Sequence, residues 1–315
     1  MDPAQFFAAS RLVIVAGKGG VGKTTVTAAL ARAAAMTGLS TLIVEVEGKS
    51  GLASVFGDEP LSYAEVELSE RIRGRTLTPD DALLEYLRDH GLSRISRRLV
   101  SSGALDVVST AAPGIKDILI LGKVKQLERT DTADLIVLDA PAAGHAITFL
   151  LAARALLDAV RVGPINTQAK EVLELLTDPA RCQVLLVTLP EETPVNELVD
   201  TAYHLEDRVG VSLGPVVVNG LYTPIEGLSA SPAEAASRAG TSLRRGEAES
   251  LAEAADFRRH RMDLQREQID RLAAELPLPQ LHLPYLFNAD LGPDDLELLA
   301  EALLDGVRSQ EAAPS

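Results

Sequence analysis

Short hydrophobic runs alternate with longer helical segments along most of this chain. The hydrophobic runs are residues 11–16, 41–46, 134–138, 183–188, 215–218 and 281–283. Brief apolar runs bounded by turn residues are typical of buried parallel strands. Residues 24–36 are rich in alanine and predict a helix that ends before Gly38. The chain therefore begins with a predicted strand, helix and strand.

The pattern changes between residues 57 and 130, where we expect helices without strands. Thr78 followed by Pro79 predicts one helix start, and a second helix is expected over residues 115–129. We therefore predict an α/β fold: a single doubly wound domain over 1–315 with a mainly parallel sheet. A helical insertion subdomain is expected at about 57–130, with a further part at about 164–178, and a disordered tail at about 308–315.

Composition narrows the possible functions. Hydrophobic residues make up 46% of the chain and aromatic residues 3%, so the core must consist of Leu, Val, Ile and Ala. A net charge of −15 argues against binding to nucleic acid. Cys182 is the one cysteine, which excludes an intrachain disulfide. No apolar run approaches the ~20 residues of a membrane span, so we expect a cytoplasmic chain without direct membrane insertion.

Residues 17–24 read Gly-Lys-Gly-Gly-Val-Gly-Lys-Thr and fit the phosphate-binding P-loop pattern between a predicted strand and helix. Backbone amides of such a loop converge on phosphate oxygens at the positive end of the helix. Lys23 is expected to bridge the β- and γ-phosphates of ATP, and Thr24 to ligate Mg²⁺. Asp139, which follows the run 134–138, is the expected second metal carboxylate, acting through water. The remaining predicted nucleotide contacts in the loop are Gly17, Gly19, Gly20, Val21, Gly22 and Thr25.

Two other interpretations compete for the same stretch. Gly17, Gly19 and Gly22 match the dinucleotide-binding fingerprint, with Glu45 as its ribose-binding acid. The glycines could also form a plain structural turn. A dinucleotide loop does not require Lys-Thr after its last glycine, nor an acid at Asp139. The presence of Lys23, Thr24 and Asp139 therefore favours the P-loop.

Several motifs together resemble one family. Residues 17–25 resemble the deviant Walker A motif of the dimeric ATPases that include MinD, ParA, nitrogenase iron protein and ArsA. Residues 139–145, followed by Phe149 and Leu150, resemble the switch II segment of ArsA and the guided-entry ATPases, which target tail-anchored proteins. Residues 113–115 resemble a helix start of that family. The resemblance covers most of residues 11–220 and the region near 284, and it is loose in the insertion.

The resemblance implies a Mg²⁺-dependent ATPase that acts as a dimeric switch, either a homodimer or a heterodimer with a paralogue. Lys18 would reach the phosphates bound by the other protomer. Gly144 would offer its N–H to the γ-phosphate. Asn219 matches the adenine-binding asparagine, and Pro284 lies where a loop covers the base.

The main departure from the family is switch I, where residues 47–50 read Glu-Gly-Lys-Ser and the family has Asp-Pro-Ala-His. Glu47 is the predicted water-positioning residue, although its longer side chain changes the geometry. The alternative is a solvated loop carboxylate, which would leave a non-hydrolysing ATP-binding interaction module. His145 either relays the nucleotide state to the insertion or is an ordinary hydrogen-bonded loop residue.

The client of such a switch is left as an unidentified protein. A single cysteine excludes the cysteine cluster of an arsenite site. Met1, Met36 and Met262 all lie outside the insertion, which weakens a hydrophobic-client chaperone or targeting factor. The apolar helix expected at 115–127 either packs in the core or keeps one face for a client. The charged segment 232–275 predicts a long solvated helix or a partner-docking surface.

Overall fold

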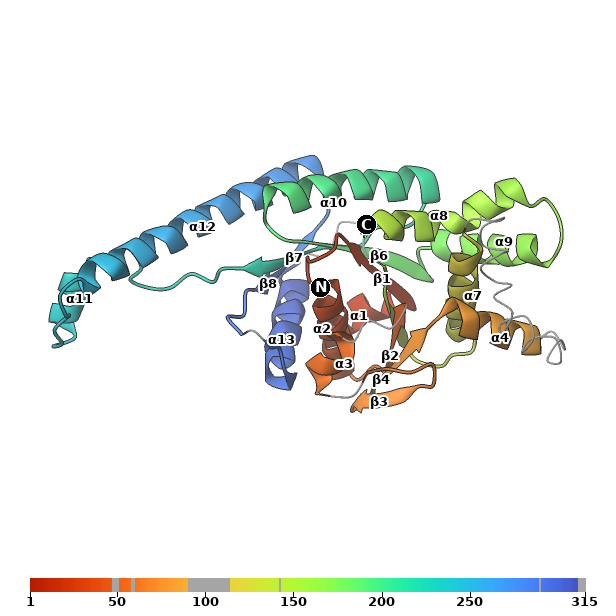
Figure 1. Ribbon diagram of the computed structural model, residues 1–315, viewed down its shortest axis with the longest axis horizontal. Helices are drawn as coiled ribbons and strands as arrows, with labels where there is room; N and C mark the ends of the chain where they lie inside the picture. The colour runs from red at the N-terminus through yellow and green to blue at the C-terminus, as the bar shows by residue number, and fades with distance from the viewer. Residues whose placement is uncertain (47–50, 58–59, 90–113, 142, 289, 311–315) are drawn as a thin grey trace.

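The computed structural model is an α/β fold organised around one eight-stranded sheet (Figure 1). The structure describes the chain except for residues 47–50, 58–59, 90–113, 142, 289 and 311–315. The strand order is β3-β4-β2-β5-β1-β6-β7-β8. All neighbouring strands are parallel except β3 and β4. The strands are β1 (Leu12–Gly17), β2 (Thr41–Val46), β3 (Val66–Ser69), β4 (Ile72–Leu77), β5 (Leu135–Asp139), β6 (Cys182–Thr188), β7 (Val216–Leu221) and β8 (Gln280–Pro284).

The six strands expected from hydrophobic runs are confirmed as β1, β2, β5, β6, β7 and β8. Every residue of β1, β2 and β5 is buried, because helices cover both faces of the sheet. Parallel strands end at one edge, so the loops after β1 and β5 meet near the middle of the sheet. That edge is where ligands bind in doubly wound folds.

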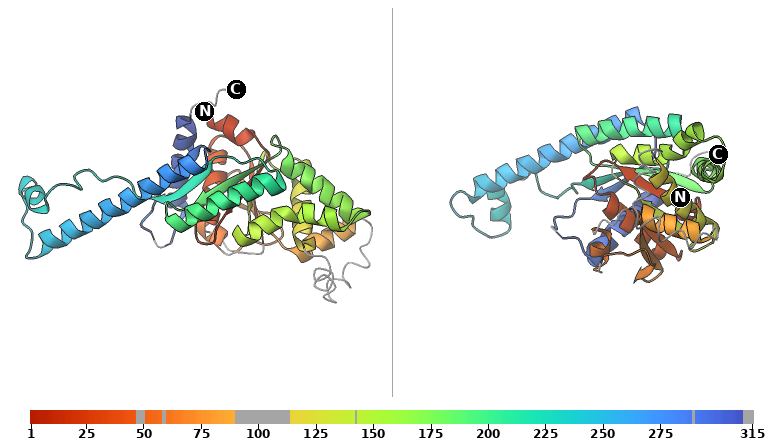
Figure 2. Two further views of the ribbon diagram at one scale, coloured as in Figure 1. Left: turned by 90° about the horizontal axis from the view of Figure 1, so that it is seen from above. Right: turned by 45° about the vertical axis from the view of Figure 1, so that its right-hand side comes forward.

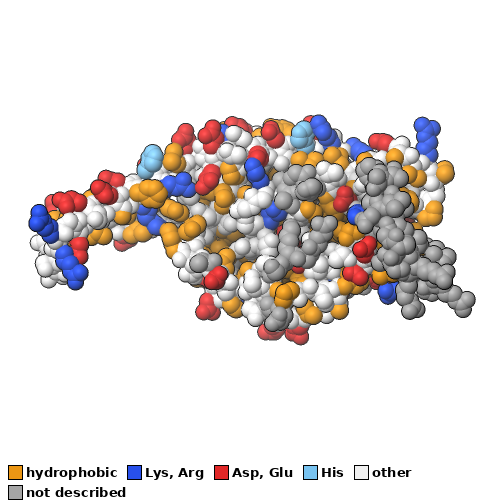
Figure 3. All heavy atoms as spheres, viewed as in Figure 1, with side chains coloured by type: hydrophobic (Ala, Val, Ile, Leu, Met, Phe, Trp, Pro, Cys, Tyr) orange, Lys and Arg blue, Asp and Glu red, His pale blue; other side chains and the backbone are white. Residues whose placement is uncertain are grey.

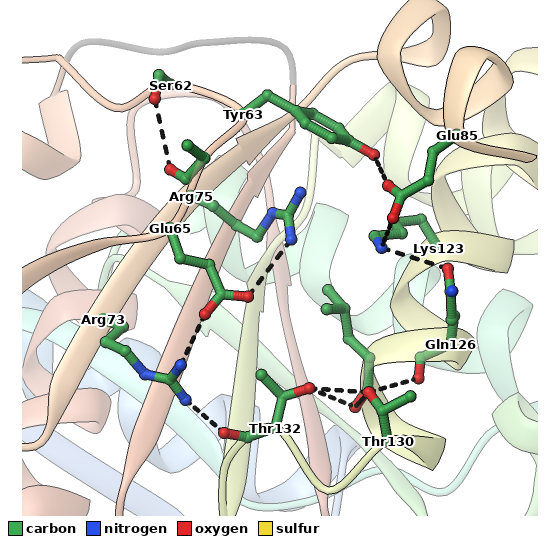
Figure 4. Close-up of polar contacts among 12 residues, drawn as sticks. Ser62, Tyr63, Glu65, Arg73, Arg75, Glu85, Lys123, Gln126, Thr130 and Thr132 are labelled. Carbon is green, nitrogen blue, oxygen red and sulfur yellow. Dashed lines mark hydrogen bonds and ion pairs between the residues drawn. The ribbon is translucent and has the colours of Figure 1, made fainter. Parts of the chain in front are cut away.

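The expectation of helices without strands between 57 and 130 is wrong for β3 and β4. Strand β4 reads Ile-Arg-Gly-Arg-Thr-Leu, and its two arginines hide the apolar run. Glu65 accepts from Arg73 at 2.7 Å and from Arg75 at 3.4 Å, as Figure 4 shows. Arg75 also lies over the ring of Tyr63, 4.5 Å from its centroid. Glu65 and Tyr63 lie outside β4 and compensate the charges of Arg73 and Arg75. This explains why a strand near the edge of the sheet can contain two arginines.

Two groups of helices cover the two faces of the sheet (Figure 2). Helices α1, α2 and α13 pack on one face, and α7, α8, α9 and α10 pack on the other. The helices are α1 (Pro3–Ala8), α2 (Lys23–Met36), α3 (Gly51–Phe56), α4 (Pro79–Asp89), α7 (Ile115–Arg129), α8 (Ala143–Ala159), α9 (Pro164–Thr177), α10 (Glu192–His204), α11 (Pro232–Arg238), α12 (Glu247–Glu275) and α13 (Pro293–Ser309). A π-helical turn, Leu205–Val209, continues α10.

Helix α7 uses its apolar residues for core packing. Ile118, Leu121 and Val124 are each 3% exposed or less and belong to the same core as α8 and α9. Helix α7 contacts α4 on another side. Because α7 packs against several elements, its hydrophobic residues cover more than the single face expected of an amphipathic helix. The core-packing interpretation of this helix is therefore confirmed.

Helices α11 and α12 form an arm that extends away from the sheet (Figures 1 and 2). The single long helix expected at 232–275 is interrupted, because residues 239–246 separate α11 from α12. Gly240 and Gly246 both have positive φ there, at 66° and 87°. Residues 308 and 309, expected in a loose tail, are the last residues of α13, and residues 311–315 of that expected tail lie outside the described residues.

Candidate nucleotide-binding site

The loop between β1 and α2 lies at the carboxyl edge of the sheet. Residues 18–20 are exposed, whereas Val21 is buried and fixes the loop to the core. Gly22 caps α2 in a left-handed conformation, with φ of 87°. The N–H groups of the first turn of α2 have no partner within the helix, and they lie at its positive end. The loop thus has the local form of an anion cradle.

Lys23 is buried beneath this loop, with 7% of its surface exposed. Its ammonium donates to the backbone oxygen of Lys18 at 2.8 Å. This contact spans the loop from its end to its beginning. The ammonium therefore lies within the loop, and its predicted contact with the β- and γ-phosphates stays a prediction.

Thr24, in the first turn of α2, meets Asp139 at the end of β5. The Thr24 hydroxyl donates to Asp139 Oδ2 at 2.7 Å, and Asp139 is fully buried. Their proximity follows from strand register, since Asp139 at the end of β5 pairs with Val15 of β1. A hydroxyl and a carboxylate oxygen are hard ligands suited to Mg²⁺. These two predicted metal residues are thus placed together, and their chemistry fits the ion.

Two loop glycines are required by close neighbours. A Cβ at Gly17 would clash with the backbone oxygen of Val187, and a Cβ at Gly22 would clash with Asn219 Nδ2. At Gly20, which also has positive φ, nothing lies within 4 Å. Glycine at 17 and 22 therefore allows β6 and β7 to approach the loop.

Asn219 and Pro284 lie beside this loop on β7 and β8. Asn219 donates through Nδ2 to the backbone oxygen of Val21 at 3.0 Å. Pro284 pairs with Leu221 of β7, and the next residue, Tyr285, donates its N–H to Leu221 at 2.8 Å. Asn219 therefore contacts the loop directly, and Pro284 lies on the neighbouring strand. Their contact with a base stays a prediction.

Lys18 lies at the exposed top of the loop and forms an ion pair with Glu197 of α10. The side chains of this pair are 44% and 38% exposed. Within one chain, Lys18 thus points along the protein surface, and Lys23 alone reaches into the loop.

The remaining predicted residues are Glu47, Gly144, His145 and Glu45. Glu47 lies outside the described residues. Gly144 is in the first turn of α8, and the side-chain surroundings of Gly144 and His145 are not described. Glu45, the acid of the dinucleotide interpretation, is 1% exposed and accepts a hydrogen bond from Thr76 at 2.9 Å. Its burial makes it a poor ribose ligand.

Sequence reasoning missed an aromatic cluster beside this site. Tyr222, Tyr285 and Phe287 have ring centroids 4.8 to 5.6 Å apart. The guanidinium of Arg258 lies 5.2 Å from the ring centroids of Tyr222 and Phe287. A Cβ at Gly220, next to Asn219, would be 3.7 Å from Tyr285. The sequence did carry one signal for this cluster: in a chain with few aromatic residues, these rings follow directly after the runs that form β7 and β8.

The same region carries exposed hydrophobic surface. Figure 3 shows hydrophobic side chains gathered where the arm joins the body. Exposed residues of the segments that meet there are Ile225, Phe257, Tyr285 and Phe287. In contrast, the described part of the chain contains no helix long and apolar enough to cross a membrane.

Comparison with known proteins extends these observations. Residues 10–162 match the family model described as anion-transporting ATPase. The matched part includes β1, the phosphate loop, β5 and Asp139.

Individual relatives agree with this match. The chain is 36% identical over 221 residues to the ATPase BagA of Mycobacterium tuberculosis, covering 66% of this chain and 64% of BagA. It is 26% identical over 323 residues to the provisionally named arsenical pump-driving ATPase of Halobacterium salinarum, covering 95% and 45%. An ATPase of Paramecium tetraurelia, described as an ASNA1 homolog, is 28% identical over 143 residues, covering 44% and 42%. The chain thus spans less than two thirds of each relative's length.

Proposed function

We propose that this chain is a Mg²⁺-dependent ATPase of the ArsA type, because residues 10–162 match the family model described as anion-transporting ATPase. We further propose that it works as a dimeric nucleotide switch of the ArsA and guided-entry type, with an unassigned protein client. The observation that carries the proposal is the 2.7 Å contact between Thr24 and Asp139 beside the buried ammonium of Lys23. Phosphate and metal ligands converge at one point of the sheet edge.

Each residue of this constellation has a chemical role in the proposal. The loop amides and Lys23 bind the β- and γ-phosphates, and charge-assisted hydrogen bonds stabilise the negative charge that develops on them. Thr24 and Asp139 hold Mg²⁺, which supplies charge neutralisation at the phosphates. Glu47 orients the attacking water. Asn219 and Pro284 bind the adenine, and the rings of Tyr222 and Tyr285 offer a stacking surface near it.

The geometry also suggests how the nucleotide state reaches the helices. Helix α8 begins shortly after Asp139, and Gly144 is in its first turn. A Cβ at Gly114, the cap of α7, would be 3.2 Å from the Cβ of Ala152 on α8. The two helices are therefore in close contact. A displacement of α8 on γ-phosphate binding would be passed to α7 by direct packing.

The contribution of Lys18 to a second protomer is part of the proposal. Its ion pair with Glu197 is partly exposed, and such pairs stabilise by about 1 kcal/mol or less. The phosphates of a partner protomer could therefore take Lys18 from Glu197 at small cost. Mixing Lys18→Ala and Lys23→Ala proteins should restore hydrolysis at some sites. No recovery in demonstrably mixed dimers would contradict action in trans.

Hydrolysis itself is tested by steady-state ATPase rates of the wild type, Glu47→Gln and Asp139→Asn. We expect both substitutions to lower the rate by about a hundredfold or more, because each displaces a group that positions water or metal. If the wild type is no faster than the variants but binds ATP with Mg²⁺ in calorimetry, the chain is a non-hydrolysing ATP-binding module.

Residues described in the insertion give little support to a hydrophobic-client groove. Most large hydrophobic residues of α7, among them Ile118, Leu121 and Val124, are buried in the core. Among the described residues of 57–130 and 164–178, the large hydrophobic side chains that are exposed are those of Val66 and Ile165. A client that binds by polar or mixed contacts agrees better with this surface.

A further inference from the structure

A cavity of about 490 Å³, with several charged side chains in its lining, lies between helices α4, α7 and α9. It is remote in the fold from the phosphate loop, because its α7 lining comes from the half of the helix that leads to the amino end of β5. A second hollow of about 400 Å³ shares Lys125, Arg129 and Glu171 with it. The cavity is lined by Ala82, Glu85, Tyr86, Leu119, Gly122, Lys123, Lys125, Gln126, Arg129, Thr130, Gln168 and Glu171.

Two nearly buried ammonium groups line this cavity. The side chains of Lys123 and Lys125 are 9% and 7% exposed. Lys123 donates to Glu85 at 2.6 Å and to Gln126 at 3.2 Å, which Figure 4 shows. Lys125 donates to Gln168 at 3.1 Å and forms an ion pair with Glu171. Buried charges are retained only when such partners compensate the loss of hydration.

The acid of the first pair is held in its ionised form. Burial alone would raise the pKa of Glu85, but hydrogen bonds from Lys123 and Tyr63 outweigh it and lower that pKa. Tyr63 belongs to the segment before β3, so the pair is supported from outside the helices (Figure 4). The side chains at this wall are therefore fixed before any ligand enters.

Basic residues outnumber acidic residues in the lining of the cavity. An ammonium has three hydrogens, and the described contacts of Lys123 and Lys125 each use two acceptors. Arg129 adds a guanidinium, and no carboxylate of a described residue lies within ion-pair distance of it. The hydrogen bond from Lys125 lowers the pKa of Glu171, and the nearby charge of Arg129 adds to this effect. Three basic residues thus face two acids in a chain whose net charge is −15.

We propose that this cavity binds a small multivalent anion carrying carboxylate or phosphate groups, held by Arg129, Lys125 and Lys123. The planar guanidinium of Arg129 would bind one anionic group of the ligand, and the ammonium groups of Lys123 and Lys125 would bind the other. The volume lies within the range of small-molecule sites, about 300 to 1,000 Å³. Because α7 contacts α8, a ligand here would also be coupled to the helix that follows Asp139. The binding itself does not depend on ATP hydrolysis.

The test is titration calorimetry of the full chain with two probes, succinate and inorganic phosphate, at constant ionic strength. The phosphate loop is first filled with excess ADP, so that binding there does not contribute. We expect one site per chain for at least one probe, and about tenfold or more loss of affinity in Arg129→Gln, from the missing charged hydrogen bonds. The probe that binds distinguishes carboxylate from phosphate ligands.

The matched control is Arg154→Gln, which removes an exposed arginine of α8 that does not line the cavity. It should bind the probe like the wild type. Equal melting temperatures of the three proteins would show that Arg129→Gln leaves the fold intact. Absence of binding by both probes, equal loss in both variants, or competition between the probe and ADP for one site would overturn the proposal.

Discussion

The body and the arm of this protein hold their charges in different ways. In the body, ion pairs join residues far apart in the sequence, such as Arg181, just before β6, with Glu128, or Lys125 of α7 with Glu171. In the arm, Arg259 and Arg266 pair with acids three residues earlier on the same helix. Pairs of the first kind fix one element against another. Those of the second kind support a single solvated helix and carry little tertiary information.

The arm is nevertheless joined to the candidate site by one buried polar residue. Gln265 of α12 is 5% exposed. Its Oε1 accepts from the N–H of Tyr222 at 2.9 Å, and its Nε2 donates to the backbone oxygen of Gly220 at 3.0 Å. Both backbone groups follow Asn219 on or just after β7. The arm is therefore mounted on the strand that also contacts the phosphate loop.

Among the substitutions that test this difference between body and arm, Arg181→Ala in the body is expected to lower the free energy of unfolding most. Arg181 binds Glu128 through two hydrogen bonds, at 3.0 and 2.6 Å, and Glu128 is 5% exposed. Removing the arginine leaves a buried carboxylate without this partner. We expect the free energy of unfolding to fall by about 2–3 kcal/mol, measured by urea denaturation. Adding Glu128→Gln should recover part of the loss, and an additive further loss would contradict this explanation.

A smaller effect is expected from Gly22→Ala in the phosphate loop. The new Cβ would clash with Asn219 and would occupy a left-handed backbone position. We expect about 2 kcal/mol of destabilisation in thermal unfolding. Gly20→Ala is the matched control, because it has the same sign of φ and open space around it.

A double-mutant cycle separates the clash from the backbone strain. Gly22→Ala should cost less in the Asn219→Ala background than in the wild type, because the clashing amide is absent. Equal costs in the two backgrounds would show that Asn219 does not constrain the loop.

Acid should weaken the contribution of Glu85. The pKa of this residue is lowered in the folded protein, so its stabilising effect is present above the unfolded pKa, near 4.3, and is lost as the pH falls. At pH 7, Glu85→Gln should cost about 1–2 kcal/mol through the charged hydrogen bond to Lys123. Urea denaturation should show a smaller difference between the two proteins near pH 3.5. A difference independent of pH would point to packing instead.

The smallest effect is expected in the arm. Arg266→Ala removes an ion pair with Asp263 whose two side chains are each 68% exposed. The change in the free energy of unfolding should be below about 0.5 kcal/mol. A loss above about 1 kcal/mol, comparable to that of the body pairs, would remove the distinction between the two regions.

Local sequence patterns were sufficient for the central sheet and the centre of the candidate site. Continuous apolar runs located β1, β2 and β5, because a parallel strand buried on both faces has no polar alternation. The glycine-rich loop and Asp139 were found because their positions relative to β1 and β5 are fixed by a few consecutive residues. The register of β5 against β1 then brings Asp139 next to the loop, where Thr24 donates to it.

Other features depend on partners that no local pattern reveals. Strand β4 was missed because its arginines are compensated by Glu65 and the ring of Tyr63. Lys18 pairs with Glu197, and Asn219 contacts Val21, across almost two hundred residues of sequence. A buried or clustered charge is stable only where the fold supplies its counterpart. Periodicity therefore located the sheet and its loop, whereas the pairing of charges, the direction of the arm and the cavity between α4, α7 and α9 arise from packing between distant segments.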